Sequence, residues 1–227
     1  MPTTTPTTPS TPPAGTPQPI DGRSARALKT REAIVDACIS LVEEGELRPT
    51  APRVAERAGV SVRSVFQHFA DLPALHIAVT ERIADRVRVL LHPVDPAMPL
   101  AGRIEAFVRH RSALLEAVTP FRRAANVHGP FAPEIQRALR QATIYLHDEV
   151  SRVFRPELDA VTDRGVRQEV LEGLAAILSW PAWDALRSDG DCTAEQATAV
   201  TARTVRALLA DAADAGSGSG SAASSGS

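Results

Sequence analysis

The chain has 227 residues, of which 25 are lysine or arginine and 27 are aspartate or glutamate, so its formal net charge is −2. This balance excludes a protein that coats nucleic acid through its overall charge, and any affinity for DNA must come from a local basic patch. The sequence contains no secretory signal and no apolar run close to 18 residues, so we expect a soluble, cytoplasmic protein that does not contact membranes.

Both ends of the chain have compositions that are typical of disorder. Residues 1–22 are rich in threonine and proline, and residues 213–227 are rich in glycine and serine. Such segments bury too little apolar surface to offset the entropy of ordering. Four basic residues follow the first tail, namely Arg23, Arg26, Lys29 and Arg31. We expect either a flexible basic arm that contacts phosphates or the minor groove of DNA, or a solvated cluster of charges.

The first predicted helix covers residues 30–44. Its apolar side chains form one helical stripe that contains Ile34, Ala37, Cys38, Leu41 and Val42. Gly45 is suited to end this helix, and Thr50 is a good N-cap for a second, short helix. Because Cys38 lies on the apolar stripe and is far from Cys192 in sequence, we expect a core cysteine and no structural disulfide.

Residues 54–69 read Val-Ala-Glu-Arg-Ala-Gly-Val-Ser-Val-Arg-Ser-Val-Phe-Gln-His-Phe and predict a helix-turn-helix. Gly59 supplies the turn, since it adopts a positive φ at little cost. Val60 would fill the corner between the two helices, and Ser61 is placed to cap the second one. The pattern is typical of a unit that inserts its second helix into the major groove of DNA.

The two faces of the second helix differ in chemistry. Val65 and Phe69 lie four residues apart and are predicted to anchor the helix to a core. The other face carries the polar side chains Arg63, Ser64, Gln67 and His68. Arginine can pair with guanine and glutamine with adenine, and residues 62–69 contain no carboxylate that would repel phosphate. An ordinary helical hairpin with a polar exterior is the simpler alternative.

The remainder of the chain predicts further helices and no strand. Asp71 can cap a helix whose apolar positions continue to Leu90, and helical stripes recur over 104–118, 119–128, 133–154, 163–179 and 193–211. The segment 119–128 is expected to be a separate short helix that is closed by Gly129 and Pro130. The fold class is therefore all-α, with a helix-turn-helix domain at 23–80 and a larger helical domain at 81–212.

Four residues of the larger domain are candidates for a ligand pocket. Arg111 falls on the apolar stripe of its helix, where a charge is costly unless it is paired. It is either a salt-bridge partner in the core or a polar contact for a ligand. Tyr145 and His147 flank an apolar stripe and could line a cavity or pack at a core edge. Trp180 could form a pocket wall or pack in a dimer interface, whereas Trp183 is expected to have a packing role.

The helix order and the residues of the N-terminal third resemble the TetR family of transcriptional regulators. The resemblance runs from about Lys29 to Val79. It rests on Thr-Arg-Glu-Ala-Ile at 30–34, Thr50, Val-Ala-Glu-Arg-Ala-Gly-Val-Ser at 54–61, Phe-Gln-His-Phe-Ala-Asp at 66–71 and Ala-Leu-His-Ile-Ala-Val at 74–79. The resemblance implies a three-helix DNA-binding unit, a helical regulatory domain, and a homodimer that is held together by the last two helices.

The resemblance also implies which residues contact DNA. Phosphate contacts are expected from Thr50, Ser61, Ser64 and His68. Base contacts are expected from Val62, Arg63 and Gln67. Phe66 belongs to the same surface but stands where the family often has a tyrosine whose hydroxyl holds a phosphate, and Leu72 stands where the family often has a lysine. Both departures imply weaker electrostatic anchoring.

These observations predict a homodimeric transcriptional regulator, and most often a repressor in this family. It would bind double-stranded DNA at a palindromic operator and be released by a mostly apolar small-molecule ligand. No two histidines lie three or four residues apart, and neither a nucleophile elbow nor a phosphate-binding loop is present, so we expect no enzyme activity, no metal and no cofactor. The alternative is a helical small-molecule carrier or scaffold that has lost useful affinity for DNA.

Overall fold

The computed structural model describes residues 22–128 and 133–218, and over these ranges the chain is helical without any strand. The elements in chain order are α1 (Gly22–Glu43), α2 (Ala51–Ala58), α3 (Val62–His68), α4 (Leu72–Arg88), α5 (Leu100–His128), α6 (Pro133–Val153), α7 (Arg155–Ala160), α8 (Arg164–Ile177), α9 (Trp180–Asp184), a π-helical turn η2 (Ala185–Asp189) and α10 (Ala194–Gly218). The all-α prediction is confirmed for this part of the chain.

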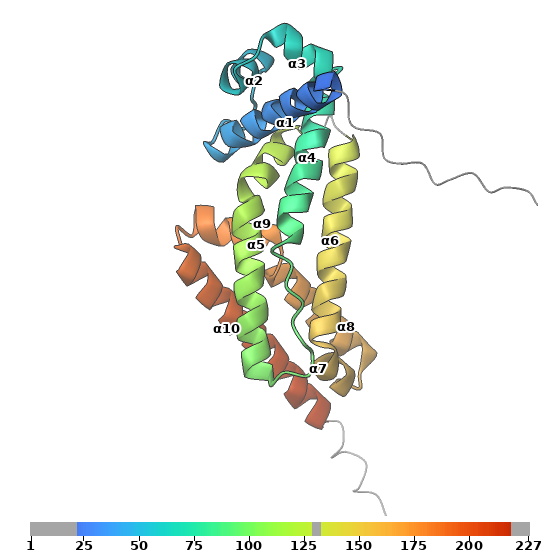
Figure 1. Ribbon diagram of the computed structural model, residues 1–227. Helices are drawn as coiled ribbons and strands as arrows, with labels where there is room; N and C mark the ends of the chain where they lie inside the picture. The colour runs from blue at the N-terminus through green and yellow to red at the C-terminus, as the bar shows by residue number, and fades with distance from the viewer. Residues whose placement is uncertain (1–21, 129–132, 219–227) are drawn as a thin grey trace, which may run out of the picture.

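The first three helices and the start of α4 form an N-terminal unit at one end of the elongated molecule (Figure 1). Its apolar core contains the almost completely buried side chains Ile34, Ile39, Leu41, Val54, Val65 and Leu75. Burying an aliphatic side chain of this size contributes about 1.5–3 kcal/mol relative to leaving it exposed. This small core fixes the relative positions of α2 and α3.

Local hydrogen bonds define the turn between α2 and α3. Gly59 adopts φ 67° and ends α2 in the left-handed conformation, as its sequence position predicts. Ser61 Oγ accepts a hydrogen bond from the Ser64 N–H at 3.1 Å and caps α3. Asp71 Oδ1 accepts one from the Ala74 N–H at 2.8 Å and caps α4. The predicted helix-turn-helix is therefore present, with both caps in place.

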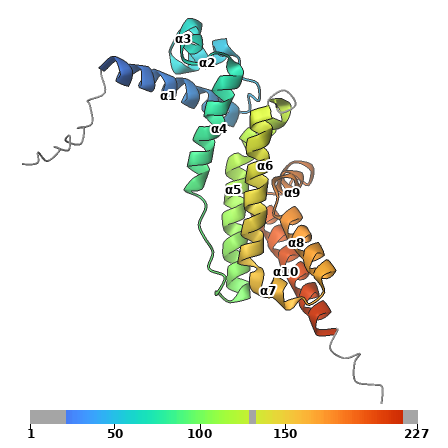
Figure 2. The ribbon, with the colours of Figure 1, turned by 90° about the vertical axis from the view of Figure 1, so that its right-hand side faces the viewer.

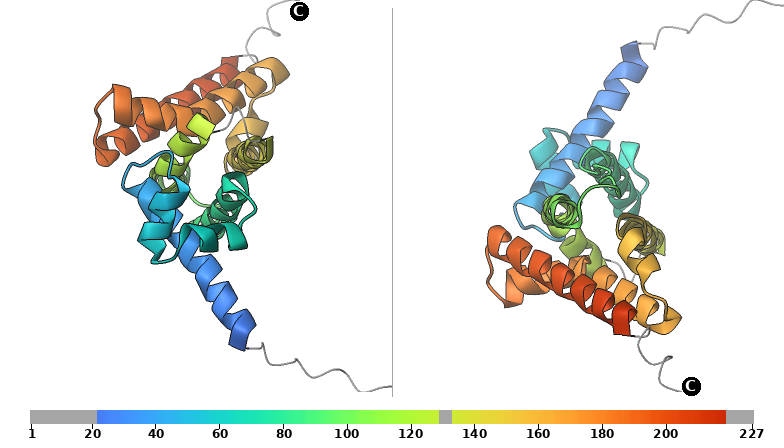
Figure 3. Two further views of the ribbon diagram at one scale, coloured as in Figure 1. Left: turned by 90° about the horizontal axis from the view of Figure 1, so that it is seen from above. Right: turned by 90° about the horizontal axis from the view of Figure 1, so that it is seen from below.

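Five helices, α4, α5, α6, α8 and α10, form a ring. α4 packs against α5 and α6, α6 packs against α8, α8 packs against α10, and α10 closes the ring against α5. The two views along the long axis of the molecule show this arrangement, and the side view shows α8 and α10 lying together on the far side of α5 and α6 (Figures 2 and 3). A second apolar core lies where α5, α6 and the last helices meet.

The prediction of a flexible basic arm before the first helix is wrong from residue 22 onward. α1 begins at Gly22, eight residues earlier than expected, and carries the exposed side chains Arg23, Arg26 and Lys29. The segment contains alanine, leucine, lysine and arginine, which are strong helix formers, and it has no internal proline or glycine. Residues 1–21, where a disordered tail was expected, lie outside the described residues.

Two later helices also differ from the sequence-based expectation. α5 continues through Pro120 to His128, so residues 119–128 are not a separate helix. A proline inside a helix removes a single N–H donor, and a long helix that is packed on several neighbours can accommodate that loss. α10 extends to Gly218, beyond residue 213, where we expected the glycine- and serine-rich tail to begin. Gly129, Pro130 and residues 219–227 lie outside the described ranges.

Candidate DNA-contacting helix and ligand cavity

α3 lies on the outer surface of the N-terminal unit, at the end of the molecule (Figure 1). Val65 and Phe69 are buried and hold the helix against the core. Arg63 and Gln67 are exposed on the opposite face, as the sequence predicts, together with Phe66, which is 48% exposed. No other part of the described chain covers this face. Its contact with DNA stays a prediction.

The other residues expected to contact phosphates surround the exposed face. Thr50 is exposed where α2 begins, and its side chain makes no capping hydrogen bond within the described chain. Its hydroxyl can therefore donate to an external acceptor. Ser61 is exposed, whereas Ser64 and His68 are partly buried along α3. Thr50 and Ser61 are the N-cap residues of α2 and α3, and Ser64 lies in the first turn of α3, where backbone N–H groups favour an anion. His68, by contrast, is the last residue of α3.

The arginines of the helix-turn-helix differ in their partners. In α2, Arg53 Nη1 lies 2.7 Å from Glu56 Oε2, and Arg57 Nη2 lies 2.6 Å from Glu44 Oε2. The hydrogen bond from Arg57 holds the pKa of Glu44 below its usual value. Arg63 in α3, by contrast, has no hydrogen bond or ion pair with any residue that the structure describes. It is the arginine of this motif that is free to bind an external acceptor.

A cavity of about 880 Å³ lies among α1, α4, α5, α6, α8 and α9. Its walls are mostly apolar and include Val79, Ile83, Leu114, Leu115, Val118 and Leu139. This volume is within the range of small-molecule binding sites. Cys38 and Val42 of α1 also line the cavity, so it reaches the N-terminal unit. Burial raises the pKa of the Cys38 thiol to about 12.

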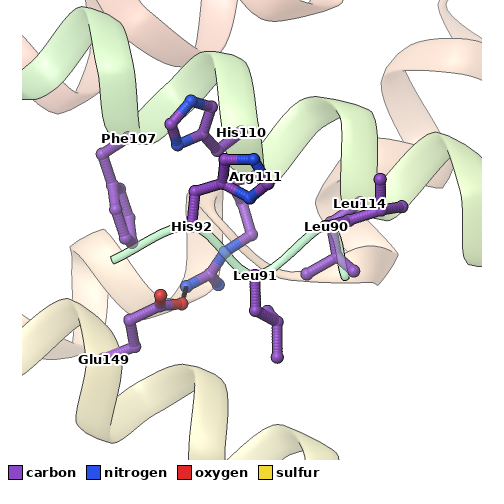
Figure 4. Close-up of a pocket in the computed structure, with 8 residues that line it drawn as sticks. All are labelled: Leu90, Leu91, His92, Phe107, His110, Arg111, Leu114 and Glu149. Carbon is purple, nitrogen blue, oxygen red and sulfur yellow. Dashed lines mark hydrogen bonds and ion pairs between the residues drawn. The ribbon is translucent and has the colours of Figure 1, made fainter. Parts of the chain in front are cut away.

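Arg111 reaches this cavity but is already paired. Its Nη2 lies 2.8 Å from Glu149 Oε2 (Figure 4). It donates further hydrogen bonds to the carbonyl oxygens of Leu178, at 3.2 Å, and Leu146, at 3.3 Å. Its guanidinium also lies over the Phe107 ring, 4.9 Å from the centroid. Burial lowers the pKa of Arg111, and the Glu149 carboxylate opposes that shift. Of the two interpretations left open by the sequence, these contacts favour the structural one.

Figure 4 also shows a second, small pocket beside Arg111, with the rings of His92 and His110 on its wall. The two ring centroids are 5.3 Å apart. The volume of this pocket is about 10 Å³, which is close to that of a single water molecule. This pocket is therefore too small for an organic ligand.

The other three predicted pocket residues all line the large cavity. Tyr145 is 46% exposed at its edge. His147 Nε2 lies 3.4 Å from Glu172 Oε1, which is also on the cavity wall. Trp180 is buried, and its indole N–H donates to Thr119 Oγ1 at 3.2 Å, which fixes the orientation of the ring. The structure thus brings these residues to one cavity, and their contact with a ligand stays a prediction.

Sequence reasoning missed Arg122, which also lines the cavity. Its guanidinium lies over the Trp180 ring, 5.1 Å from the centroid. Leu115, Val118 and Arg122 follow one another at helical spacing on the same face of α5. Like Arg111, Arg122 is a charged residue on the apolar stripe of its helix, where a charge is costly unless it is paired. The expected helix break near Pro120 separated Arg122 from that stripe.

The part of the chain that the structure describes contains no group of side chains suited to hold a metal ion. Within the same residues, no helix combines the length and the apolar character that spanning a membrane requires.

No protein-family model and no curated protein matches the sequence. Solved structures do resemble it. A protein assigned to the TetR family of transcriptional regulators, from Mesorhizobium loti MAFF303099, superposes with a TM-score of 0.61 at 19% identity, over 82% of this chain and 98% of that chain. A transcriptional regulator from Rhodococcus sp. Rha1 superposes with a TM-score of 0.57 at 18% identity, over 82% and 97%. The chain therefore has the fold of TetR-family regulators, which confirms the resemblance at the level of the fold.

Proposed function

We propose that the protein is a transcriptional regulator, and most simply a repressor, that binds double-stranded DNA at a palindromic operator. The observation that carries this proposal is the exposed face of α3, where Arg63 and Gln67 project from a helix anchored by Val65 and Phe69. Both are side chains that read base edges in the major groove. The fold shared with the two solved regulators supports the proposal. Such a protein binds rather than catalyses, and acts in the cytoplasm.

The last helices support a homodimer as the functional form. α8 and α10 pack against each other on one side of the molecule (Figure 2). The exposed positions of α10 include several small residues, Ala199, Ala207 and Ala210. Small side chains allow the helices of two subunits to approach closely. We propose that this face of α8 and α10 pairs with the same face of a second copy, which would place two α3 helices on one palindromic site.

The position of the cavity supports release of DNA by a small molecule. Phe121 of α5 packs against the core of the N-terminal unit, and its neighbour Arg122 lines the cavity. Arg48, between α1 and α2, donates a hydrogen bond to the Val127 carbonyl of α5 at 3.1 Å. A ligand that shifts this end of α5 would therefore move the N-terminal unit. A tenfold loss of operator affinity needs only about 1.4 kcal/mol of coupling between the two sites.

The positions of the two largest apolar cores support a division of the chain into two functional domains. We propose that residues 23–80 bind DNA and that residues 81–212 bind the ligand and form the dimer. α4 crosses the boundary between them, because its first half packs in the N-terminal core and its second half lines the cavity. A carrier or scaffold that has lost DNA affinity is the competing possibility, and the exposed Phe66 favours it because this ring cannot donate a hydrogen bond to phosphate.

Selection of binding sites from random duplex DNA by the full-length protein tests the proposal. The expected result is a palindromic consensus whose half-sites are centred about one helical turn apart or somewhat more. Gln67→Glu places a carboxylate on α3 without changing the shape of the side chain, and it should abolish selection. Gln136→Glu makes the same chemical change on α6, far along the chain from α3, and should leave selection intact. Failure of the unmodified protein to enrich any sequence at low salt would favour the carrier.

A further inference from the structure

Most polar side chains on the wall of the large cavity already have partners within the protein. Arg111 pairs with Glu149, and His147 lies beside Glu172. Arg88 has its Nη1 3.1 Å from Asp85 Oδ1. These groups need no ligand to satisfy them. A ligand that fills the cavity therefore contacts mainly aliphatic and aromatic surface. The exception is the wall near α9, where Arg122 lies beside Trp180.

Arg122 differs from these groups, because its charge is partly buried without a counter-charge. Its Nε is inaccessible to solvent and has no hydrogen-bond partner, and it forms no ion pair with the described residues. Burial accordingly lowers the pKa of its guanidinium. The nearby carboxylate of Asp184 is already bound by Arg123, at 2.7 Å from Nη2 and 3.0 Å from Nε. A partly buried cation without a partner is costly, so an external anion would be favoured there.

The guanidinium of Arg122 is also held in a defined position. It stacks over the ring of Trp180, and the hydrogen bond from Trp180 to Thr119 fixes that ring. A planar guanidinium presents several N–H donors in a geometry that matches a carboxylate. Because both Arg122 and Trp180 line the cavity, an acid group inside it can approach the guanidinium beside the ring. Arg122 is thus a preorganised anion receptor on an apolar wall.

We propose that the ligand of the cavity is an amphipathic organic acid, with an apolar body and one acidic group that binds Arg122 beside Trp180. This inference rests on the proposed role of the cavity as the regulatory site. It adds the charge of the ligand and the place where that charge is bound. The acidic group would lie next to Phe121, at the end of α5 that contacts the N-terminal unit, so binding there is well placed to affect α3.

The test is displacement of a neutral fluorescent probe, N-phenyl-1-naphthylamine, from the full-length protein near neutral pH. Decanoate and 1-decanol serve as competitors, because they differ mainly in the presence of the anionic group. In a purely apolar cavity the alcohol would win, since the carboxylate loses its hydration on entering. We expect decanoate to displace the probe at a concentration at least about tenfold lower than 1-decanol, equivalent to about 1.4 kcal/mol.

Variants test whether Arg122 causes the preference for decanoate. Arg122→Gln should reverse the order of the two competitors while leaving displacement by 1-decanol unchanged, and Arg122→Lys should retain part of the preference for decanoate. Arg88→Gln removes an exposed cation from the wall of the same cavity and should leave the preference intact. Circular dichroism checks that each variant is folded. If Arg122→Gln does not fold, the inference is tested by whether decanoate displaces the probe at a lower concentration than 1-decanol in the unmodified protein, and by whether Arg122→Lys weakens that preference.

Three results would overturn the inference. They are equal displacement by both competitors in the unmodified protein, a preference for 1-decanol, or a preference for decanoate that survives Arg122→Gln. None of these measurements contains DNA. Their failure therefore leaves the DNA-binding proposal intact, and failure of the DNA selection would not affect this result.

Discussion

The buried pair of Arg111 and Glu149 gives a direct prediction of stability. Their side chains are only 3% and 8% exposed, and the shortest distance between their charged atoms is 2.8 Å. Glu149→Ala leaves the guanidinium buried without its counter-charge, a change that typically costs about 3–5 kcal/mol. We expect a value near the lower end, about 3 kcal/mol, because the carbonyls of Leu146 and Leu178 still accept hydrogen bonds from Arg111.

A double-mutant cycle separates the pair from its surroundings. Arg111→Met leaves the Glu149 carboxylate and two carbonyls without their donor and should be at least as destabilising as Glu149→Ala. Arg111→Met combined with Glu149→Leu removes both charges, so the double variant should be less destabilised than Arg111→Met alone or Glu149→Leu alone, the two single variants of this cycle. The measurement is urea unfolding followed by circular dichroism, at one fixed protein concentration because a dimer's stability depends on it. A cost below about 1 kcal/mol for Glu149→Ala, or additive effects, would refute the structural role of Arg111.

The other two predictions concern the thiols and the basic start of α1. With its pKa raised to about 12, Cys38 should react with a disulfide reagent near pH 8 only after unfolding, whereas the partly exposed Cys192 should react in the native protein; two native thiols of equal rate would contradict this burial. Replacing both Arg26 and Lys29 by glutamine should reduce the slope of log affinity for DNA against log salt by about 0.9 for each phosphate that these side chains neutralise. An unchanged slope would show that this part of α1 does not bind phosphates.

The helix-turn-helix was predictable because its signals are local. A glycine that needs a positive φ, a serine that caps the next helix, and apolar residues four apart all act within a few residues of one another. Val65 and Phe69 were expected to be buried and Arg63 and Gln67 exposed, and each lies on the expected side of α3. These choices depend little on the remainder of the fold.

The ligand cavity was less predictable because its features depend on contacts between distant segments. Arg122 and Trp180 are 58 positions apart, and nothing local indicates that they stack. Asp184 could have paired with either Arg122 or Arg123, and only the packing of α9 against α5 assigns it to Arg123. Pro120 was expected to break a helix, because local propensity favours a break, but tertiary packing keeps α5 continuous. For Arg111, likewise, the sequence indicated that the charge needed a partner but could not indicate that the partner is Glu149.

The central claim is that Arg63 reads a base, and its most direct test compares Arg63→Ala with the unmodified protein on the selected operator and on operators changed at single positions. We expect Arg63→Ala to lose about 1–3 kcal/mol of binding free energy on the selected operator and to lose discrimination at one base pair in each half-site. Arg109→Ala removes an exposed charge from α5 and should leave both unchanged. An equal loss of affinity on every sequence, or no loss, would contradict the claim.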